Sequence, residues 1–332
     1  MTKGERTMRR HFAPCLLALG VVLAEAAPHV HAGEYASFTT IDFPGATSTA
    51  ALDINAAGEI VGSYIDAVGT HGYRLDNRGE FRSIDFPRAV LTRAAGINGR
   101  GDIVGTYRLP TDPTTARHGF LLSRGEFTTI DPPGAVFTNP LGMNGSGDIV
   151  GRFCVNVPCA PEGASPENVH GFLLSNGAFT IIDVPDARGT NAWKINSRGD
   201  IVGGYTGGDG NKHVFLLRLE RGDLATIDIP GAGETGLDNG GINSRGDIVA
   251  VYCDAKPCRS TNRDAHGFLL SGHYLTRIDF PGASDTNAFA INARGDIVGV
   301  YDDAIGSHGF LLTRNERDEA CAMWTARRMP CN

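Results

Sequence analysis

The chain repeats one pattern six times, and this repeat restricts the possible fold more than any other feature of the sequence. Each copy contains Ile-Asp with Pro two residues later, then Ile-Asn, Gly-Asp-Ile-Val and His-Gly-Phe, with few substitutions. The aspartates of the Ile-Asp pairs are Asp42, Asp85, Asp131, Asp183, Asp228 and Asp279, which lie 43 to 52 residues apart. A period of this size is typical of one propeller blade.

Each copy divides into four expected strands. In the last copy, residues 286–292 and 296–301 form two strands joined by Asn-x-x-Gly, which is a hairpin signal. Residues 308–313 form the third strand. The fourth strand is a segment like Phe-Thr-Thr-Ile-Asp-Phe, and the Pro that follows ends it. The unit is therefore predicted to be a four-stranded β-sheet.

The two ends of the repeat region complement each other. The region opens with a lone fourth strand at 37–43 and closes with a third strand at 308–313 that lacks a fourth. Pairing of these strands would complete the last sheet and close a ring, which hides strand edges that otherwise favour aggregation. The sequence thus predicts an all-β fold, a six-bladed β-propeller over residues 33–315, with a short tail at 316–332.

These motifs also carry a family resemblance. Ile-Asn-x-x-Gly-Asp-Ile-Val-Gly followed by His-Gly-Phe-Leu-Leu, over about residues 37–313, resembles the HAF repeat family of bacterial probable extracellular repeat proteins. The chain departs from the family name by His-Gly-Phe in place of His-Ala-Phe. Residues 199–205 resemble the second strand of kelch blades. The resemblance implies secretion and a propeller-like fold whose first strand is innermost.

The N-terminus is predicted to be a signal peptide, residues 1–32. Arg9 and Arg10 precede an apolar run at 12–27, and Val30-His31-Ala32 has the small residues of a cleavage site. We expect a secreted or periplasmic protein, exported by the Sec or the twin-arginine route, with no membrane span after cleavage. The alternative is an uncleaved membrane anchor.

The cysteines agree with export. Removal of Cys15 with the signal leaves six, and an even count in an exported chain indicates disulfides. The expected local pairs are Cys154 with Cys159, Cys253 with Cys258, and Cys321 with Cys331. The last pair would close the tail. Zinc is the alternative, but it needs four ligands at suitable spacing, so no metal is predicted.

The net charge and the absence of known catalytic motifs exclude several classes of function. A net charge of −7 disfavours nucleic acid as a partner. The chain has no Gly-x-Ser-x-Gly elbow, phosphate-binding glycine loop or His-Glu-x-x-His, so no cofactor is predicted. Residues 207–211 hint at a calcium loop but lack the later acidic ligand.

The six histidines of His-Gly-Phe and the six Ile-Asp aspartates suggest metal or acid–base chemistry at first sight. Each copy belongs to its own blade, however, and neighbouring blades of such a ring are rotated by roughly 60°. The histidines therefore cannot converge on one ion. We expect them to hydrogen-bond with the aspartates and hold turns and loops within each blade.

A functional site in a repeat protein should appear as departures from the repeat. Before Ile-Asn, Asp53 and Lys194 replace the usual Gly or Ala, and four positions before the Ile, Arg93 and Asp238 replace the usual Asn. With Trp193, these residues form a predicted channel-mouth site for a small polar ligand. The alternative is solvated polar substitution for the four charged residues and a core position for Trp193. The loops between strands two and three vary in length, and the one at 154–169 is long. We expect any functional site on the face that carries these loops, or in the mouth of the central channel on that face.

The leading functional hypothesis is an exported, non-catalytic binding or scaffold module for an unidentified small polar ligand, carbohydrate or protein. The alternative is a carbohydrate- or lactone-directed lyase or hydrolase with its site at the channel mouth. This alternative depends on fold analogy, so whether the protein is an enzyme stays open at this point. A structural surface-layer component is a third possibility.

Overall fold

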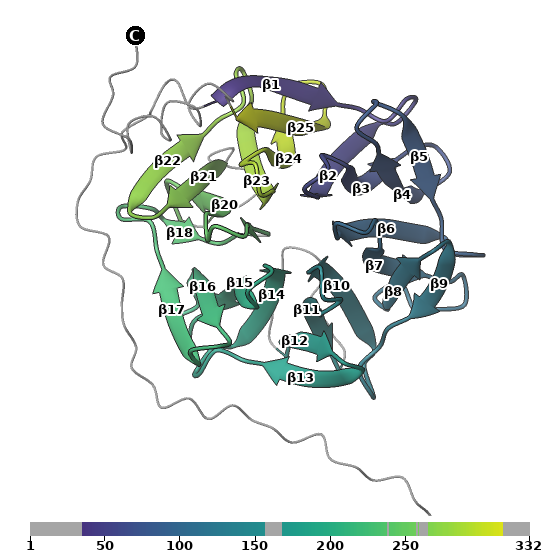
Figure 1. Ribbon diagram of the computed structural model, residues 1–332, viewed down its shortest axis with the longest axis horizontal. Helices are drawn as coiled ribbons and strands as arrows, with labels where there is room; N and C mark the ends of the chain where they lie inside the picture. Colours follow the sequence, from purple (N-terminus) through teal and green to yellow (C-terminus); the bar gives the residue numbers. More distant parts are fainter. Residues whose placement is uncertain (1–34, 157–167, 238, 257, 259–264, 315–332) are drawn as a thin grey trace, which may run out of the picture.

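The fold is entirely β in the part of the chain that the computed structural model describes. The described residues are 35–156, 168–237, 239–256, 258 and 265–314. Their four-stranded blades stand around a central axis, as in a β-propeller (Figure 1). No helix in these ranges could cross a membrane. The predicted signal peptide at 1–32 and the tail at 316–332, with Cys321 and Cys331, lie outside the described residues.

Each repeat contributes strands at four distances from the axis. The innermost are β2 (Ser48–Ile54), β6 (Leu91–Ile97), β10 (Phe137–Met143), β14 (Gly189–Ile195), β18 (Glu234–Thr235) with β19 (Gly241–Ile242), and β23 (Asp285–Ile291). The second are β3 (Ile60–Ile65), β7 (Ile103–Arg108), β11 (Ile149–Cys154), β15 (Asp200–Thr206), β20 (Ile248–Cys253) and β24 (Ile297–Asp302). The third are β4 (Thr70–Leu75), β8 (His118–Ser123), β12 (His170–Ser175), β16 (Lys212–Arg218), β21 (Ala265–Ser271) and β25 (Ser307–Arg314). The outermost are β5 (Phe81–Ile84), β9 (Glu126–Thr129), β13 (Ala178–Ile182), β17 (Asp223–Ile227), β22 (Tyr274–Ile278) and β1 (Tyr35–Ile41).

Hydrogen bonding groups these strands into five sheets, not into one separate sheet for each of the six repeats as expected. Three sheets have four strands, one has five because the inner strand of the fifth repeat is divided into β18 and β19, and one has eight. The eight-stranded sheet joins the first two repeats through one parallel pair, Thr70 with Leu91. The repeats approach closely because Gly72 has no side chain: a Cβ there would lie 3.1 Å from the Ala94 nitrogen.

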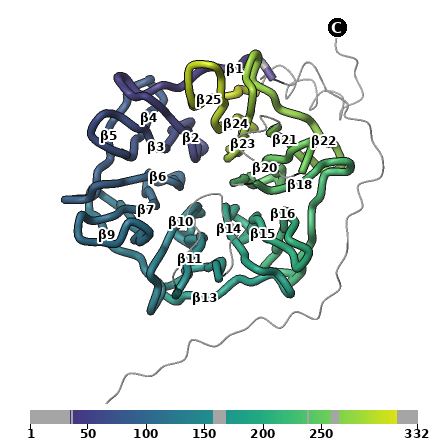
Figure 2. The backbone as a smooth tube through the Cα atoms, turned by 180° about the vertical axis from the view of Figure 1, so that it is seen from behind, coloured from purple at the N-terminus to yellow at the C-terminus, as the bar shows by residue number. Residues whose placement is uncertain are grey.

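The two ends of the repeat region pair as the sequence predicts. Strand β1 runs antiparallel to β25, with Phe38 opposite Leu312 and Ile41 opposite Gly309 (Figures 1 and 2). The Phe38 ring packs edge-on against Phe280 and Phe310, at centroid distances of 5.0 and 5.5 Å. The first strand covers Tyr35–Ile41 and not the predicted 37–43. The N-terminal strand therefore completes the sheet of the last repeat.

A recurrent pair of glycine and aromatic residue builds the core. Gly105 on the second strand of its repeat lies opposite Phe120 on the third, and the Phe120 ring is fully buried. A Cβ on Gly105 would lie 2.9 Å from the Phe120 ring. The same register recurs in the pairs Gly62–Tyr73, Gly151–Phe172, Gly203–Phe215 and Gly299–Phe310. Glycine thus leaves the space that the neighbouring ring fills, which is why both residues recur in the repeat.

Candidate functional site

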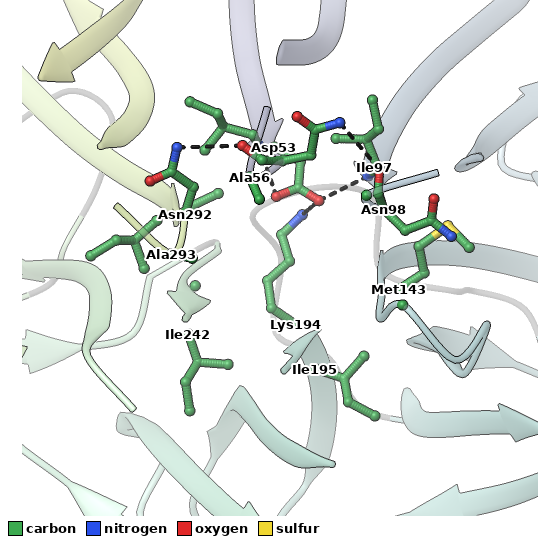
Figure 3. Close-up of a pocket in the computed structure, with 17 residues that line it drawn as sticks. Asp53, Ala56, Ile97, Asn98, Met143, Lys194, Ile195, Ile242, Asn292 and Ala293 are labelled. Carbon is green, nitrogen blue, oxygen red and sulfur yellow. Dashed lines mark hydrogen bonds and ion pairs between the residues drawn. The ribbon is translucent and has the colours of Figure 1, made fainter. Parts of the chain in front are cut away.

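Asp53 and Lys194, two departures from the repeat, meet at the centre of the molecule (Figure 3). Asp53 is next to last in β2 and Lys194 is next to last in β14. Each follows a register shift in its strand, after Ala51 in one case and after Ala192 in the other. A bulge of this kind re-aims a side chain, and the two side chains here point toward each other.

Lys194 holds four inner strands together. Its Nζ lies 3.1 Å from Asp53 Oδ2 on β2 and donates to the carbonyl oxygens of Ala95 on β6, at 2.8 Å, and Leu141 on β10, at 2.7 Å. An ammonium group has three N–H bonds, so these acceptors use all of them. Lys194 is 8% exposed. The side chain therefore acts as a crosslink between the first four repeats.

Asp53 is equally well provided with donors. Its Oδ1 accepts the Ile54 amide at 3.0 Å, and its Oδ2 accepts the Ile97 amide at 2.9 Å beside the Lys194 ammonium. Burial raises the pKa of Asp53 and lowers the pKa of Lys194, and in each case the partner's opposite charge opposes the shift. The pair is thus a buried ion pair whose hydrogen-bonding groups are satisfied within the protein.

A small polar cavity of about 140 Å³ surrounds this pair. Its lining includes Asn55, Gly99, Gly145 and Ala293, which belong to the short links between strands one and two. Links of this type lie on the face opposite the links between strands two and three, because neighbouring strands of a repeat are antiparallel. The mouth that holds the ion pair is therefore not the one that adjoins the variable loops, where we expected a site.

The asparagines of Ile-Asn also connect neighbouring repeats, a role that turn chemistry alone does not predict. Asn196 Oδ1 accepts the backbone amides of Arg198 and Asp200, while its Nδ2 donates to Asp200 Oδ2 and to the Asn243 carbonyl of the next repeat. Equivalent bonds to the next repeat come from Asn55, Asn144, Asn243 and Asn292. One feature of the sequence could have indicated this role: an acidic residue stands four positions after each of these asparagines. Its carboxylate accepts a hydrogen bond from the same Asn Nδ2 group that donates to the next repeat.

The recurrent histidines bond to the recurrent aspartates, as predicted. His71 Nδ1 lies 2.6 Å from Asp85, and His308 Nδ1 lies 2.9 Å from Asp42 across the ring closure. The other pairs are His118–Asp131, His170–Asp183, His213–Asp228 and His266–Asp279. Each pair joins the third strand of a repeat to the end of the fourth strand that pairs with it, so each histidine bonds to its own aspartate and the six do not assemble one site.

The remaining candidates do not join Asp53 and Lys194. Trp193 is 1% exposed and packs in the core between the fourth and fifth repeats, which is the alternative given for it above. Arg93 does not line the cavity of the ion pair. Burial, followed by the like charges of Arg117 and Arg152, lowers the pKa of Arg93 to about 10. Asp238 lies outside the described residues.

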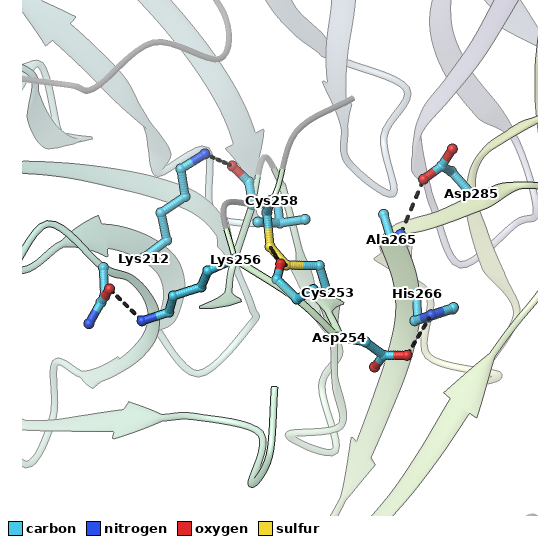
Figure 4. The surroundings of a disulfide bond; sticks show 11 residues. Lys212, Cys253, Asp254, Lys256, Cys258, Ala265, His266 and Asp285 are labelled. Carbon is cyan, nitrogen blue, oxygen red and sulfur yellow. Dashed lines mark hydrogen bonds and ion pairs between the residues drawn. A yellow bond between two sulfur atoms is a disulfide. The ribbon is translucent and has the colours of Figure 1, made fainter. Parts of the chain in front are cut away.

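The predicted disulfide between Cys253 and Cys258 is present (Figure 4). It closes the loop after β20, where Lys256 Nζ donates to Asn211 Oδ1 of the fourth repeat at 2.6 Å. Glu234 lies near the two sulfur atoms, but sulfur atoms in a disulfide are not thiolate ligands for a metal. Cys154 is also disulfide-bonded, and its expected partner Cys159 lies outside the described residues.

Solved structures share the fold of this chain at low sequence identity. No family model and no curated protein matches it, so the HAF resemblance stays a prediction. A fucose-specific lectin from Aleuria aurantia is 12% identical, with a TM-score of 0.51 over 84% of this chain and 93% of the lectin. A mutant of AofleA from Arthrobotrys oligospora is 11% identical, with a TM-score of 0.50 over 84% and 88% of the two chains. An inactive virginiamycin B lyase from Staphylococcus aureus is 9% identical, with a TM-score of 0.45 over 83% and 99%. The first two matches show a propeller fold and nothing of function.

Proposed function

We propose that this protein is an exported, non-catalytic binding module built as a six-bladed β-propeller. The eight-stranded sheet counts as two blades in this proposal. Its halves, β2 to β5 and β6 to β9, are each antiparallel and four-stranded, and one residue pair joins them. Support for export comes from the signal-like N-terminus and from the disulfide Cys253–Cys258, since such bonds persist in oxidising compartments.

One observation carries the non-catalytic part of the proposal. The acidic and basic groups at the centre already have partners inside the protein: three acceptors for the Lys194 ammonium and three donors for the Asp53 carboxylate. A general acid or base must exchange a proton with a substrate within hydrogen-bond reach. The cavity beside the pair has a volume of about 140 Å³, whereas pockets for organic ligands are typically about 300–1,000 Å³. The centre is thus better suited to hold the blades together than to process a substrate.

Ligand contact is assigned in this proposal to the face of the links between strands two and three. These links vary in length between repeats, and one of them carries the disulfide Cys253–Cys258. Variable loops on a rigid scaffold are the usual place for recognition. The partner on this face is a small polar ligand, a carbohydrate or a protein surface.

The test compares binding with turnover on the same preparation. The secreted chain from residue 33 onward is applied to a glycan array and a protein-interaction screen, and in parallel to a broad set of lyase and hydrolase substrates. Binding without turnover, lost when the loop at 154–169 is shortened and retained when the Ser123–Glu126 turn is altered, supports the proposal. Turnover that depends on Asp53 would overturn it. N-terminal sequencing of the secreted protein, expected to begin at Gly33, tests export.

A lyase or hydrolase at the channel mouth is the second candidate, and the opposed pKa shifts of Asp53 and Lys194 favour it. Shifted pairs of this kind occur at catalytic sites as well as in structural ion pairs. In that case Asp53→Asn would abolish turnover of a lactone or polysaccharide substrate in a protein that remains folded. Unchanged turnover in Asp53→Asn would remove this candidate.

A further inference from the structure

A cleft of about 320 Å³ opens between the fourth and fifth repeats. It shares Ile242 with the cavity of the central ion pair, but neither Asp53 nor Lys194 lines it. Its apolar lining consists of Leu216, Ala225, Ile227, Ile242, Ile248 and Leu270, all of them buried in the protein. Its polar lining includes Arg218, Asp200 and His273. Gly246, in the link from strand one to strand two, and Gly272, in the link from strand three to strand four, both line the cleft. The cleft therefore lies on the face that carries these two kinds of link. This face is opposite the variable loops.

A departure from the repeat explains part of this space. In four repeats the outermost strand carries a phenylalanine. It packs in a cluster with the last residue of strand one (isoleucine, or methionine in the third repeat), an isoleucine of strand two and the leucine of strand three. These phenylalanines are Phe38, Phe81, Phe127 and Phe179. The fifth repeat has Leu275 at this position, and Leu275 packs in the same cluster as Ile242, Ile248 and Leu270 of the cleft. A smaller side chain beside these three residues leaves volume that a ring would fill.

Two further departures face the same cleft from the fourth repeat. Ala225 stands where the other repeats have Thr or Arg, so the wall of β17 is smaller and apolar at this point. Arg218 stands where the other repeats have Ser, Thr or Asp. At three of those positions the serine donates to the carboxylate just before the second strand, for example Ser123 to Asp102 at 2.7 Å. Arg218 instead brings a guanidinium group to the cleft.

The charges around the cleft favour an anionic ligand group at Arg218. The buried Asp200 carboxylate is already bonded by Arg198 and Asn196. Arg218 Nη1 donates to Asp223 at 2.8 Å, and its side chain is 33% exposed. An ion pair this exposed is weak, and a guanidinium group with five N–H donors can bind a second carboxylate in addition.

We propose that this cleft binds a small organic acid that has an aromatic or branched apolar body and one carboxylate. The apolar body lies among Ile242, Ile248 and Leu270, in the space beside Leu275, and the carboxylate pairs with Arg218. The volume suits a ligand at the small end of the usual range for organic ligands. This site is separate from the face assigned to ligand contact above, so neither proposal depends on the other.

Phenylacetate and 3-phenylpropionate, titrated calorimetrically into the secreted chain, are the probes. We expect both acids to bind, phenylacetamide to bind at least tenfold more weakly, and acetate, which lacks the apolar body, to give no measurable heat. Arg218→Ser, which restores a residue common in the repeat, should weaken phenylacetate binding at least tenfold. Leu275→Phe should abolish it by filling the cleft. Ala225→Thr serves as a second, milder filling variant if Leu275→Phe folds poorly.

The repeat supplies matched controls. Leu224→Phe makes the same change in the fourth repeat, where Leu224 packs in a cluster with Ile195 and Ile201 that contributes no residue to the cleft. Arg221→Ser removes an exposed arginine from the turn that follows β16. Both should bind phenylacetate as the unaltered chain does. Failure of both acids to bind, or full binding by Arg218→Ser and Leu275→Phe, overturns the proposal. A chain with the loop at 154–169 shortened should keep full affinity for phenylacetate, which separates failure here from failure of the binding function on the other face.

Discussion

Lys194 Nζ lies 3.1 Å from Asp53 Oδ2, although the two residues belong to the fourth and the first repeat. Both residues are less than one tenth exposed. Because most repeats have glycine or alanine at these positions, the ion pair interrupts the symmetry of the ring at one place. It connects inner strands that their sheets do not connect, and it does so through charged groups in a buried environment.

Loss of one member of this pair should be more harmful than loss of both. Lys194→Met leaves the buried Asp53 carboxylate without its counter-ion, and we expect the free energy of unfolding to fall by about 3–5 kcal/mol. The double variant Asp53→Ala, Lys194→Met should be more stable than Lys194→Met alone. Urea unfolding measures both. Losses that simply add in the double variant would show that the two groups do not interact.

The pairing of the two ends should contribute to stability as much as an internal outer strand does. Phe38→Ala removes a ring that packs on Phe280 and Phe310, and we expect a loss of about 2–4 kcal/mol. Phe127→Ala, at the corresponding position of an internal repeat, is the control and should cost a similar amount. A chain that tolerates Phe38→Ala but not Phe127→Ala would show that β1 does not complete the last sheet in solution.

The links between neighbouring repeats should be sensitive to single amide groups. Asn196→Ala removes acceptors for two backbone amides and the donor to the Asn243 carbonyl. We expect thermal unfolding to show a loss of about 1–3 kcal/mol, since buried groups lose their partners. Ser197→Ala, at an exposed position in the same turn, should have little effect. Equal, small effects of the two changes would contradict the structural role of the asparagine.

The raised pKa values of two histidines lead to a prediction of how the stability of the fold varies with pH. The hydrogen bond and charge of Asp183 raise the pKa of His170 above 6.5, and those of Asp228 do the same for His213. A raised pKa in the folded state stabilises the fold fully below pH 6.5, and this contribution disappears as the pH rises through the folded-state pKa. We therefore expect His213→Gln to reduce the decline in melting temperature between about pH 6 and pH 8.

His273 provides the control for that experiment. It is exposed and does not belong to the recurrent histidine set, so His273→Gln removes a histidine without removing a recurrent His–Asp bond. A profile that is the same for His213→Gln and the unaltered chain would show that the His213–Asp228 pair does not titrate with folding.

The disulfide Cys253–Cys258 should add a moderate amount of stability. Its cysteines are five residues apart, and closing so short a loop limits the unfolded chain by about 2 kcal/mol in the loop-entropy account. The variant Cys253→Ser, Cys258→Ser should lose roughly that amount in denaturant unfolding. A reducing agent should lower the stability of the unaltered chain, and it should have a smaller effect on the double variant.

The repeat in the sequence was sufficient to predict the strand order and the closure of the ring. Strands and Asn-x-x-Gly turns are local features of the sequence, and they recur in every repeat. The lone fourth strand at the start of the repeat region indicated how the ring closes. The His-Asp bonds were predictable for the same reason, because both partners recur together. Bounds were less accurate: β1 covers Tyr35–Ile41 and not the predicted 37–43, since hydrogen bonds with β25 decide where pairing begins.

Contacts between repeats were decided by the tertiary structure. The sequence singled out Asp53 and Lys194 as departures, but only their positions around the ring show that Lys194 also reaches the carbonyls of Ala95 and Leu141. The cleft beside Arg218 and Leu275 was not predicted, because a missing ring forms a cavity only if the facing wall does not close on it. The repeated residues determine the fold of each repeat and the contacts that all neighbouring repeats share. A cavity depends instead on how the side chains of two particular repeats pack against each other.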